Sequence, residues 1–506
     1  MSENTYPSVN DLTLEEKASL TSGGDAWHLQ GVEAKGIPGY MITDGPHGLR
    51  KSNSATTGEV DLNNSVPATC FPPAAGLSSS WNPELIHQVG EAMAEECIQE
   101  KVAVILGPGV NIKRNPLGGR CFEYWSEDPY LAGHEAVGIV AGVQSKGVGT
   151  SLKHFAANSQ ETDRLRISAN ISQRALREIY FPAFEHIVKE AQPWTIMCAY
   201  NCINGVHAAQ DRWLLTDVLR DEWGFQGIVM SDWGADHDRV ASLNAGLNLE
   251  MPPSYTDDQI VYAARDGRIQ PAQLDRMAQG MIDLVSKTRA AMSVENYRFD
   301  IEAHDEVAHQ AAVESMVLLK NDDAILPVAG DAKVTVIGEF ARTPRYQGGG
   351  SSHITPTKMT SFLDTLAERG ADVAFAPGFT LDLEPADAKL EAEAVETAKN
   401  ADVVLMFLGL PEAAESEGFD RETLDIPAKQ VELLKAVAAE NKNIVVVLSN
   451  GSVVSVAPWA GNAKGILESW LLGQAGGPAL ADVIFGKVSP SGKLAQTIPM
   501  DINDDP

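Results

Sequence analysis

The chain has 506 residues, of which 44% are hydrophobic and 21% charged. This composition is ordinary for a soluble globular protein, but the chain is too long for one compact core, so two large domains are expected. With 39 Lys and Arg against 69 Asp and Glu, the formal net charge is −30. A surface this acidic repels phosphate backbones and anionic lipid, so we expect neither nucleic acid nor a membrane as partner.

The N-terminal residues have no basic region followed by an apolar one, and no run of 18 or more apolar residues occurs. These features predict a cytoplasmic protein without a signal peptide. The cysteines are sparse and lack the spacing of metal ligands, so reduced, buried thiols are expected rather than disulfides. They are Cys70, Cys97, Cys121, Cys198 and Cys202.

From about residue 35 to 290, short apolar runs alternate with longer helical patterns, which is typical of parallel βα units. Two of the helical patterns cover 82–100 and 172–191, the second with Ser172 as N-cap. The runs that we predict to be strands are 39–44, 102–109, 149–155, 195–201 and 227–233.

Each predicted strand ends in polar residues or glycine. In a (β/α)8 barrel, residues just past the carboxyl ends of the strands line the mouth of the active site. This arrangement brings Asp232 into one pocket with Asp44, Lys153, His154 and Tyr200. The alternative is that each is a solvated loop residue.

A second βα series follows a segment, 296–328, that reads as a linker and a helix. It predicts a three-layer α/β/α sandwich. The strands expected in it are 333–340, 372–378, 402–410, 443–451 and 465–473. The predicted organisation is therefore a barrel domain over 1–295, a linker and connecting helix over 296–325, and a sandwich domain over 326–506.

Three glycine-rich stretches, among them "QGGGSSH" (347–353), lack the spacing of a dinucleotide or phosphate-binding loop. We interpret them as tight turns that let the backbone approach another surface closely.

An acidic loop, "EAAESEGFDRETLDIP", follows a predicted strand of the second domain. Glu412, Glu415 and Glu417 lie close together in it. Carboxyl groups that are crowded or desolvated have raised pKa values, which suits a general acid near neutral pH. The alternative is a solvated acidic loop in an acidic protein.

Several motifs together resemble glycoside hydrolase family 3, of the β-glucosidase type, in the expected order over nearly the whole chain. They are "TDGPHGLR" (43–50), "NPLGGRCFEYWSEDPYL" (115–131), "KHFAANSQETDR" (153–164), "YNCINGVHA" (200–208), "GIVMSDWGA" (227–235), "GGGSS" (348–352) and "ESEGFDR" (415–421).

The resemblance implies a two-domain retaining glycosidase with its active site where the domains meet. Asp232 resembles the catalytic nucleophile and Glu417 the acid/base, with Glu415 as the alternative for the second role. The residues matching positions that hold the sugar are Asp44, Arg50, Arg120, Lys153, His154, Arg164 and Tyr200, and those flanking it are Trp233 and Ser351. No metal or organic cofactor is implied. Family members usually continue into a fibronectin-III-like domain, whereas this chain stops at Pro506.

The chemistry of a retaining glycosidase suits these residue types. It needs one ionised carboxylate and one protonated carboxyl about 5 to 5.5 Å apart. We expect Lys153, His154 and nearby arginines to keep Asp232 ionised. Charged groups also bind sugar hydroxyls through strong hydrogen bonds, and Trp233 offers an apolar face to the ring.

The predicted function is release of terminal β-D-glucose from small β-glucosides or oligosaccharides. The alternatives are β-xylosidase or α-arabinosidase activity in the same family, and a carbohydrate-binding protein without turnover. The N-acetylglucosaminidase branch carries a "KHFPGHG"-like stretch that this chain lacks. The aglycone depends on variable loops, so neither its identity nor an oligomeric state is predicted.

Overall fold

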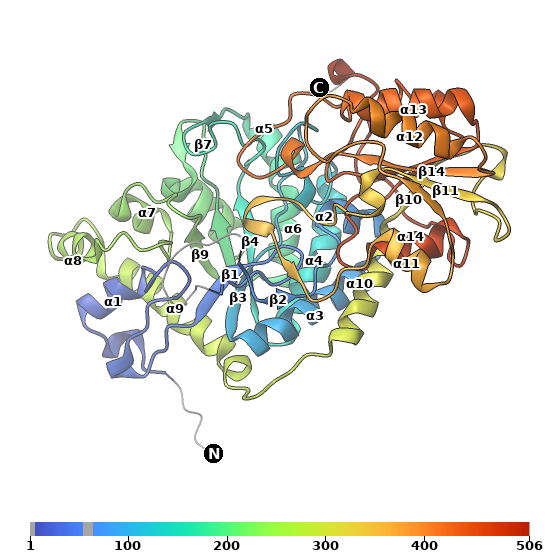
Figure 1. Ribbon diagram of the computed structural model, residues 1–506. Helices are drawn as coiled ribbons and strands as arrows, with labels where there is room; N and C mark the ends of the chain where they lie inside the picture. The colour runs from blue at the N-terminus through green and yellow to red at the C-terminus, as the bar shows by residue number, and fades with distance from the viewer. Residues whose placement is uncertain (1–5, 54–63, 505–506) are drawn as a thin grey trace.

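The computed structural model describes residues 6–53 and 64–504 and has two α/β bodies side by side, each with its own hydrophobic core (Figure 1). Val104 and Phe184 belong to the first core, Phe407 and Val446 to the second. Part of the N-terminal stretch used above, residues 1–5, lies outside the described residues. Among the described residues, no helix has both the length and the apolar character needed to cross a membrane.

The first body is built on a five-stranded parallel sheet in the order β1-β3-β4-β6-β9. All five strands predicted for this region are confirmed, and their residues are buried. They are β1 (Met41–Asp44), β3 (Val102–Leu106), β4 (Gly149–Phe155), β6 (Thr195–Cys198) and β9 (Ile228–Ser231).

The predicted (β/α)8 barrel is only partly confirmed, because the described residues form a curled five-stranded sheet rather than eight regular βα units. Beyond β9 the curl continues through single parallel bridges, Met230 to Leu249 and Ser22 to Glu250. Pro252 and Pro253 follow Leu249 and Glu250 closely in the sequence. They lack the amide hydrogen that a longer strand would need for its hydrogen bonds.

Helices surround this sheet, and the one predicted over 82–100 is confirmed as α3, with Asn82 as N-cap. The helices are α1 (Leu14–Leu20), α2 (Ala74–Leu77), α3 (Pro83–Glu100), α4 (Pro129–Ser145), α5 (Gln173–Ala175), α6 (Pro182–Ala191), a wider π-type helix (Trp213–Glu222), α7 (Arg239–Ala245), α8 (Asp257–Arg265) and α9 (Pro271–Met292).

The helix predicted over 172–191 is interrupted. Ser172 is its N-cap as expected and accepts a hydrogen bond from the amide of Ala175 at 3.2 Å. A π-type turn, Leu176–Tyr180, then separates α5 from α6. Pro182 at the start of α6 lacks an amide hydrogen, and its ring would collide with the preceding turn of a continuous α-helix.

The second body contains a six-stranded sheet in the order β10-β16-β15-β14-β11-β13, in which only β10 is antiparallel to its neighbour. Helices α12 and α13 lie on one face, and α10, α11 and α14 on the other, so the three-layer prediction is confirmed (Figure 1). The strands are β10 (Val317–Asn321), β11 (Val334–Ile337), β13 (Ala374–Ala376), β14 (Val403–Gly409), β15 (Ile444–Ser449) and β16 (Gly465–Glu468). The helices are α10 (Ile301–Ser315), α11 (Phe362–Glu368), α12 (Ala388–Ala398), α13 (Ala428–Glu440) and α14 (Gly476–Ile484).

One strand of this sheet, β10, was not predicted. The segment 296–328 was expected to contain a linker and a helix, but α10 ends at Ser315 and β10 begins at Val317. A short apolar run directly after a helix, with no glycine or proline between them, cannot be distinguished from the end of that helix by its pattern. Pairing with β16 decides its conformation.

The two bodies are joined along a broad contact. Helix α10 packs on α3 of the first body, where His304 meets Glu96 at 2.8 Å and Glu95 at 3.3 Å. Two-residue strands β2 (Pro67–Ala68) and β12 (Thr355–Pro356) pair across the contact.

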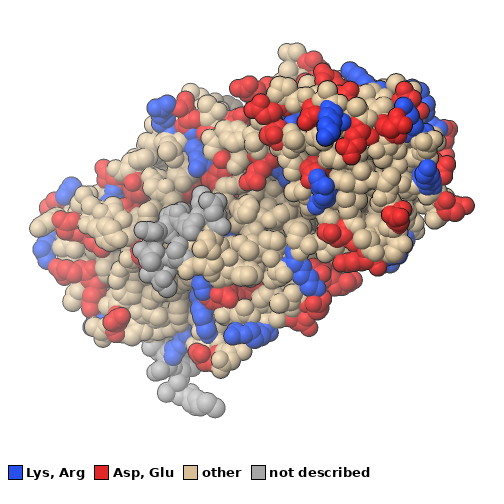
Figure 2. Space-filling model, in the orientation of Figure 1, with Lys and Arg blue, Asp and Glu red and all other residues tan. Residues whose placement is uncertain are grey.

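Short strands β5 (Ser168–Ala169), β7 (Cys202–Ile203) and β8 (Val206–His207) form a separate sheet. On the visible face, acidic side chains are scattered among residues of other kinds, with Lys and Arg between them (Figure 2).

Candidate active site

A cavity of about 280 Å³ lies where the two bodies meet. Every residue predicted for the site lines it except Arg50. Its lining consists of Trp27, Asp44, Arg120, Lys153, His154, Arg164, Met197, Tyr200, Asp232, Trp233, Gly350, Ser351, Glu417 and Gly418.

Several polar side chains of this cavity lie at or just past the ends of strands of the first body. Asp44 is the last residue of β1, Lys153 and His154 lie near the end of β4, and Asp232 directly follows β9. Tyr200 comes two residues after β6. Because the carboxyl ends of parallel strands meet at one edge of the sheet, these residues converge although they are far apart in sequence.

Asp232 is buried at the end of β9, with 7% of its surface exposed. One oxygen, Oδ1, accepts a hydrogen bond from the backbone amide of Trp233 at 2.8 Å, and Oδ2 lies 3.8 Å from Nε2 of His154. Burial raises the pKa of Asp232 above its ordinary value, and the nearby charges of Arg120 and Lys153 only partly oppose this. Burial therefore has the larger effect on the pKa of Asp232, and the expectation that the surrounding cations keep it ionised stays a prediction.

His154 does not act as one of those cations. Burial, together with the positive charges of Arg120 and Lys153, holds the pKa of His154 well below its ordinary value. Its ring is therefore neutral near pH 7. The hydroxyl oxygen of Tyr124 lies 3.1 Å from Nδ1 of the same ring, within hydrogen-bond distance. The side-chain amide oxygen of Asn111 accepts a hydrogen bond from the backbone amide of His154 at 2.9 Å. These contacts fix the position of His154 beside Asp232.

Glu417 reaches the cavity from the loop after β14 and meets two arginines of the first body. Its Oε1 accepts a hydrogen bond from Nη1 of Arg164 at 2.8 Å and lies 3.5 Å from Nη1 of Arg120. Its Oε2 accepts one from the backbone amide of Ser351 at 2.8 Å. Burial alone raises the pKa of Glu417, but the two guanidinium groups and Ser351 outweigh it, so the pKa lies below its ordinary value. The raised pKa expected for this carboxyl group is not found.

The three glutamates of the acidic loop do not gather at one point. Glu415 is fully buried, pairs with Nη1 of Arg345 at 2.7 Å and accepts a hydrogen bond from the amide of Gly451 at 3.0 Å. Glu412 is exposed. Burial raises the pKa of Glu415, but Arg345 and its other partners hold it below the ordinary value. Of the three, only Glu417 lines the cavity.

Arg50 lies behind the cavity and supports Asp44. It is fully buried and donates from Nη1 to Oδ2 of Asp44 at 2.9 Å. Burial raises the pKa of Asp44 in spite of the opposing charges of Lys153 and Arg50. A ligand in the cavity thus meets Asp44 directly, whereas Arg50 contacts two residues of its lining, Asp44 and the ring of Trp27, whose centroid lies 5.6 Å from Cζ.

Trp27 and Met197 line the cavity but were not predicted from the sequence. Trp27 stacks at a tilt on Trp233, with ring centroids 5.3 Å apart. It precedes the first predicted strand, in a loop with no periodic pattern, and an aromatic residue among glycines, "GGDAWHLQG", is the only sequence signal for it.

Gly350, within "QGGGSSH", makes the close approach that the sequence predicted for a tight turn. Its φ is +86°, and an added Cβ would lie 2.5 Å from Cβ of Glu417. Only glycine combines this backbone conformation with room for the neighbouring carboxylate.

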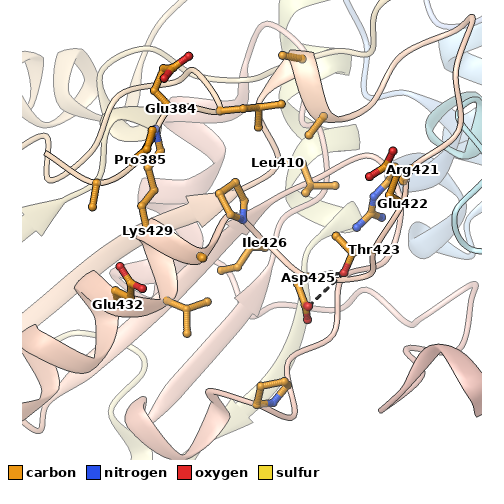
Figure 3. Close-up of a pocket in the computed structure, with 18 of the residues that line it drawn as sticks. Glu384, Pro385, Leu410, Arg421, Glu422, Thr423, Asp425, Ile426, Lys429 and Glu432 are labelled. Carbon is orange, nitrogen blue, oxygen red and sulfur yellow. Dashed lines mark hydrogen bonds between the residues drawn. The ribbon is translucent and has the colours of Figure 1, made fainter.

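A larger cavity, of about 1060 Å³, lies in the second body (Figure 3). Glu384, Lys429 and Glu432 line one part of it and Arg421 and Glu422 another. It contains none of the predicted site residues. The smaller cavity is the better candidate for catalysis, because charged groups of both signs with shifted pKa values converge on it.

The fold and this cavity define a two-domain α/β protein in which carboxylates and arginines of both domains converge on one cavity. A family model described as "Glycosyl hydrolase family 3 N terminal domain" matches residues 49–284, and one described as "Glycosyl hydrolase family 3 C-terminal domain" matches 316–506. The chain belongs to glycoside hydrolase family 3.

Three similar proteins bear on its specificity. The "Exo-alpha-(1->6)-L-arabinopyranosidase" of Bifidobacterium longum is 85% identical over 515 residues, which cover 100% of this chain and 68% of that protein. The "GH3 beta-glucosidase" of Bifidobacterium adolescentis has a solved structure with 91% identity and a TM-score of 0.96, over 99% of this chain and 72% of that one. "Beta-glucosidase 3B" of Thermotoga neapolitana, solved in complex with glucose, has 35% identity and a TM-score of 0.88, over 98% and 76% of the two chains.

Proposed function

We propose that this chain carries the active site of a retaining exo-glycosidase in which Asp232 is the nucleophile and Glu417 the acid/base. The observation that supports this most directly is that the two carboxylates reach one cavity from different domains. Asp232 attacks the anomeric carbon while the bond to the aglycone oxygen breaks, and Glu417 gives that oxygen its proton. In the second half, Glu417 takes a proton from water, and the water oxygen displaces Asp232 from the sugar.

The charge of Glu417 sets a condition on this mechanism. Arg164 and Arg120 lower the pKa of Glu417, which favours its ionised form, and this form cannot donate a proton. A bound glycoside has to move or screen these arginines before Glu417 can act as an acid. Arg164 is the better placed of the two to move, because its side chain is 20% exposed whereas that of Arg120 is 3% exposed.

For the substrate, terminal α-L-arabinopyranosides are our first choice and β-D-glucosides the second. This reverses the order predicted from the sequence, because a relative at 85% identity is named an arabinopyranosidase. The pyranose rings of α-L-arabinosides, β-D-xylosides and β-D-glucosides all place the leaving group equatorially. They differ in the hydroxymethyl group on C5 and in the orientation of the hydroxyl on C4, so one pair of carboxylates serves all three.

A panel of p-nitrophenyl glycosides tests this proposal. It contains α-L-arabinopyranoside and the β-D forms of glucose, xylose, galactose and N-acetylglucosamine, and kcat/KM is measured for each. The highest value with the arabinopyranoside supports the proposed specificity, whereas the highest value with the glucoside restores the order from the sequence. Binding of the free sugars without any turnover points to a carbohydrate-binding protein instead. The anomer first seen by NMR distinguishes retention from inversion.

A further inference from the structure

One side chain of the loop that carries Glu417, that of Asp420, makes four hydrogen bonds to the first domain. Its Oδ1 accepts hydrogen bonds from the backbone amides of Gly119 and Glu161, each at 2.9 Å. Its Oδ2 accepts them from the amide of Thr162 at 2.9 Å and from the hydroxyl of Thr162 at 2.6 Å. All four donors belong to the first domain, while Asp420 belongs to the second.

The backbone that Asp420 binds also carries the arginines that flank Glu417. Gly119 directly precedes Arg120. Glu161 accepts a hydrogen bond from Nη1 of Arg164 at 2.6 Å and another from the amide of Gly418, next to Glu417, at 2.9 Å. Asp420 therefore fixes the acid/base loop relative to both arginine loops at once.

The next residue, Arg421, fixes the same loop to its own domain. Its Nη1 donates to Oγ of Ser452 and to the carbonyl of Val453, each at 2.8 Å. The adjacent pair of residues thus connects the two domains. The backbones are in close contact here as well, because an added Cβ on Gly119 would lie 1.8 Å from the carbonyl oxygen of Phe419.

We infer that Asp420 is a positioning residue, which docks the loop on the first domain so that Glu417 lies within reach of the aglycone oxygen of a bound glycoside. This rests on the proposed role of Glu417. Asp420 does not line the cavity, so replacing it changes none of the lining residues. Its loss displaces the acid but leaves the nucleophile in place.

The test uses the full chain with Asp420→Asn and Asp420→Ala. Asparagine has the same shape as aspartate, but one of its two terminal atoms is an NH2 group, which cannot accept a hydrogen bond. Because both oxygens of Asp420 accept hydrogen bonds, either orientation of the asparagine amide places the NH2 group against donors of the first domain. With the sugar that the panel ranks first, kcat/KM is measured for a dinitrophenyl glycoside and for an alkyl glycoside. A displacement of about 1 Å costs about 10²-fold. We expect that loss with the alkyl leaving group and less than about threefold with dinitrophenol, which departs without protonation.

Three further variants make the outcome decisive. Gly119→Ala pushes the loop away by steric overlap without removing a charge and should reproduce the selective loss. Asp425→Ala removes another carboxylate of the same loop, one that accepts a hydrogen bond from Thr423 of its own domain (Figure 3), and should leave both rates unchanged. Glu417→Ala should show the same selectivity as the Asp420 variants, but a larger loss.

Two results would overturn the inference while leaving Glu417 as the acid. One is a selective loss in Glu417→Ala that is absent from folded Asp420→Asn and Gly119→Ala. The other is an equal loss with both leaving groups in the Asp420 variants, which indicates general disruption of the site. If Glu417→Ala itself shows no selectivity, the proposed function fails, and the inference fails with it.

Discussion

The environments of Asp232 and Glu417 shift the pKa values of these two carboxyl groups in opposite directions. Burial raises the pKa of Asp232, whereas Arg120 and Arg164 lower that of Glu417 in spite of its burial. A retaining mechanism needs the nucleophile ionised and the acid protonated. For Glu417 to act as the acid in the proposed mechanism, it has to gain a proton in spite of Arg120 and Arg164, so we expect a bound glycoside to weaken its contact with them.

Asp232→Asn should reduce turnover by about three orders of magnitude or more with every leaving group, because the nucleophile takes part in both chemical steps. Asparagine keeps the shape of the side chain, so sugar binding should persist. Steady-state rates and calorimetric binding of the free sugar measure the two effects. A 2-fluoro glycoside should also label Asp232 in the parent protein, and a label on any other residue moves the nucleophile.

Glu417→Gln should lower the melting temperature near neutral pH but not in acid. The pKa of Glu417 is lowered in the folded state by Arg120 and Arg164. The ionised form of Glu417 thus stabilises the folded state at pH values above 4.5, its ordinary pKa. This contribution is lost as the pH falls below 4.5 toward the lower pKa that Glu417 has in the folded state. The difference in melting temperature between parent and variant should be constant from pH 7 to about 5 and shrink below about 4.5. A difference that stays constant down to pH 3 contradicts the ionic origin.

Among the elements, α3 and α4 approach each other more closely than ordinary side chains allow. Gly138 and Gly142 on α4 face the backbone of α3, and an added Cβ on Gly142 would lie 2.2 Å from the carbonyl oxygen of His87. Glycine usually weakens a helix. Here it is required because the backbone of the neighbouring helix occupies the space of a side chain.

Gly142→Ala should therefore destabilise the protein, although the same change in an open helix stabilises it. Overpacking against backbone costs about 1–3 kcal/mol, which exceeds the gain in helix propensity of about 1 kcal/mol. Calorimetric unfolding measures the change. Gly461→Ala is the matched control, because no atom lies within 4 Å of its added Cβ, and it should change stability by less than about 0.5 kcal/mol. Equal effects of the two variants would show that α4 can move away from α3.

At the scale of the whole molecule, the site exists only because the two domains are docked. The first domain supplies Asp232 and Arg164, and the second supplies Glu417 and Ser351. The paired strands β2 and β12, the contact of α10 with α3 and the bonds of Asp420 all hold the same arrangement. Glu417 therefore reaches the cavity from a different domain than Asp232.

Glu417→Ala tests this division between the domains. Hydrolysis of alkyl or sugar aglycones should fall by about 10²- to 10⁴-fold, the usual contribution of a general acid, while attack on a dinitrophenyl glycoside is largely spared. Release of the sugar from Asp232 should still slow, because the base for water is missing. Azide needs no base, so it should restore turnover and give a glycosyl azide of retained configuration. Rescue of Glu415→Ala in place of Glu417→Ala would assign the acid to Glu415.

The sequence indicated every strand of the two main sheets except β10, the three-layer second domain and, with the help of the family resemblance, most of the residues around the cavity. Strand periodicity and the polar residues at strand ends are local properties, and the motif around Asp232 is contiguous. The curl of the first sheet and the strand conformation of β10 became clear only from the folded structure. The same holds for the position of Arg50 behind Asp44 and for the pairing of Glu415 with Arg345 instead of a place in the cavity. The folded structure also set the pKa directions. These depend on burial and on charges brought together from distant parts of the chain, which no local pattern records.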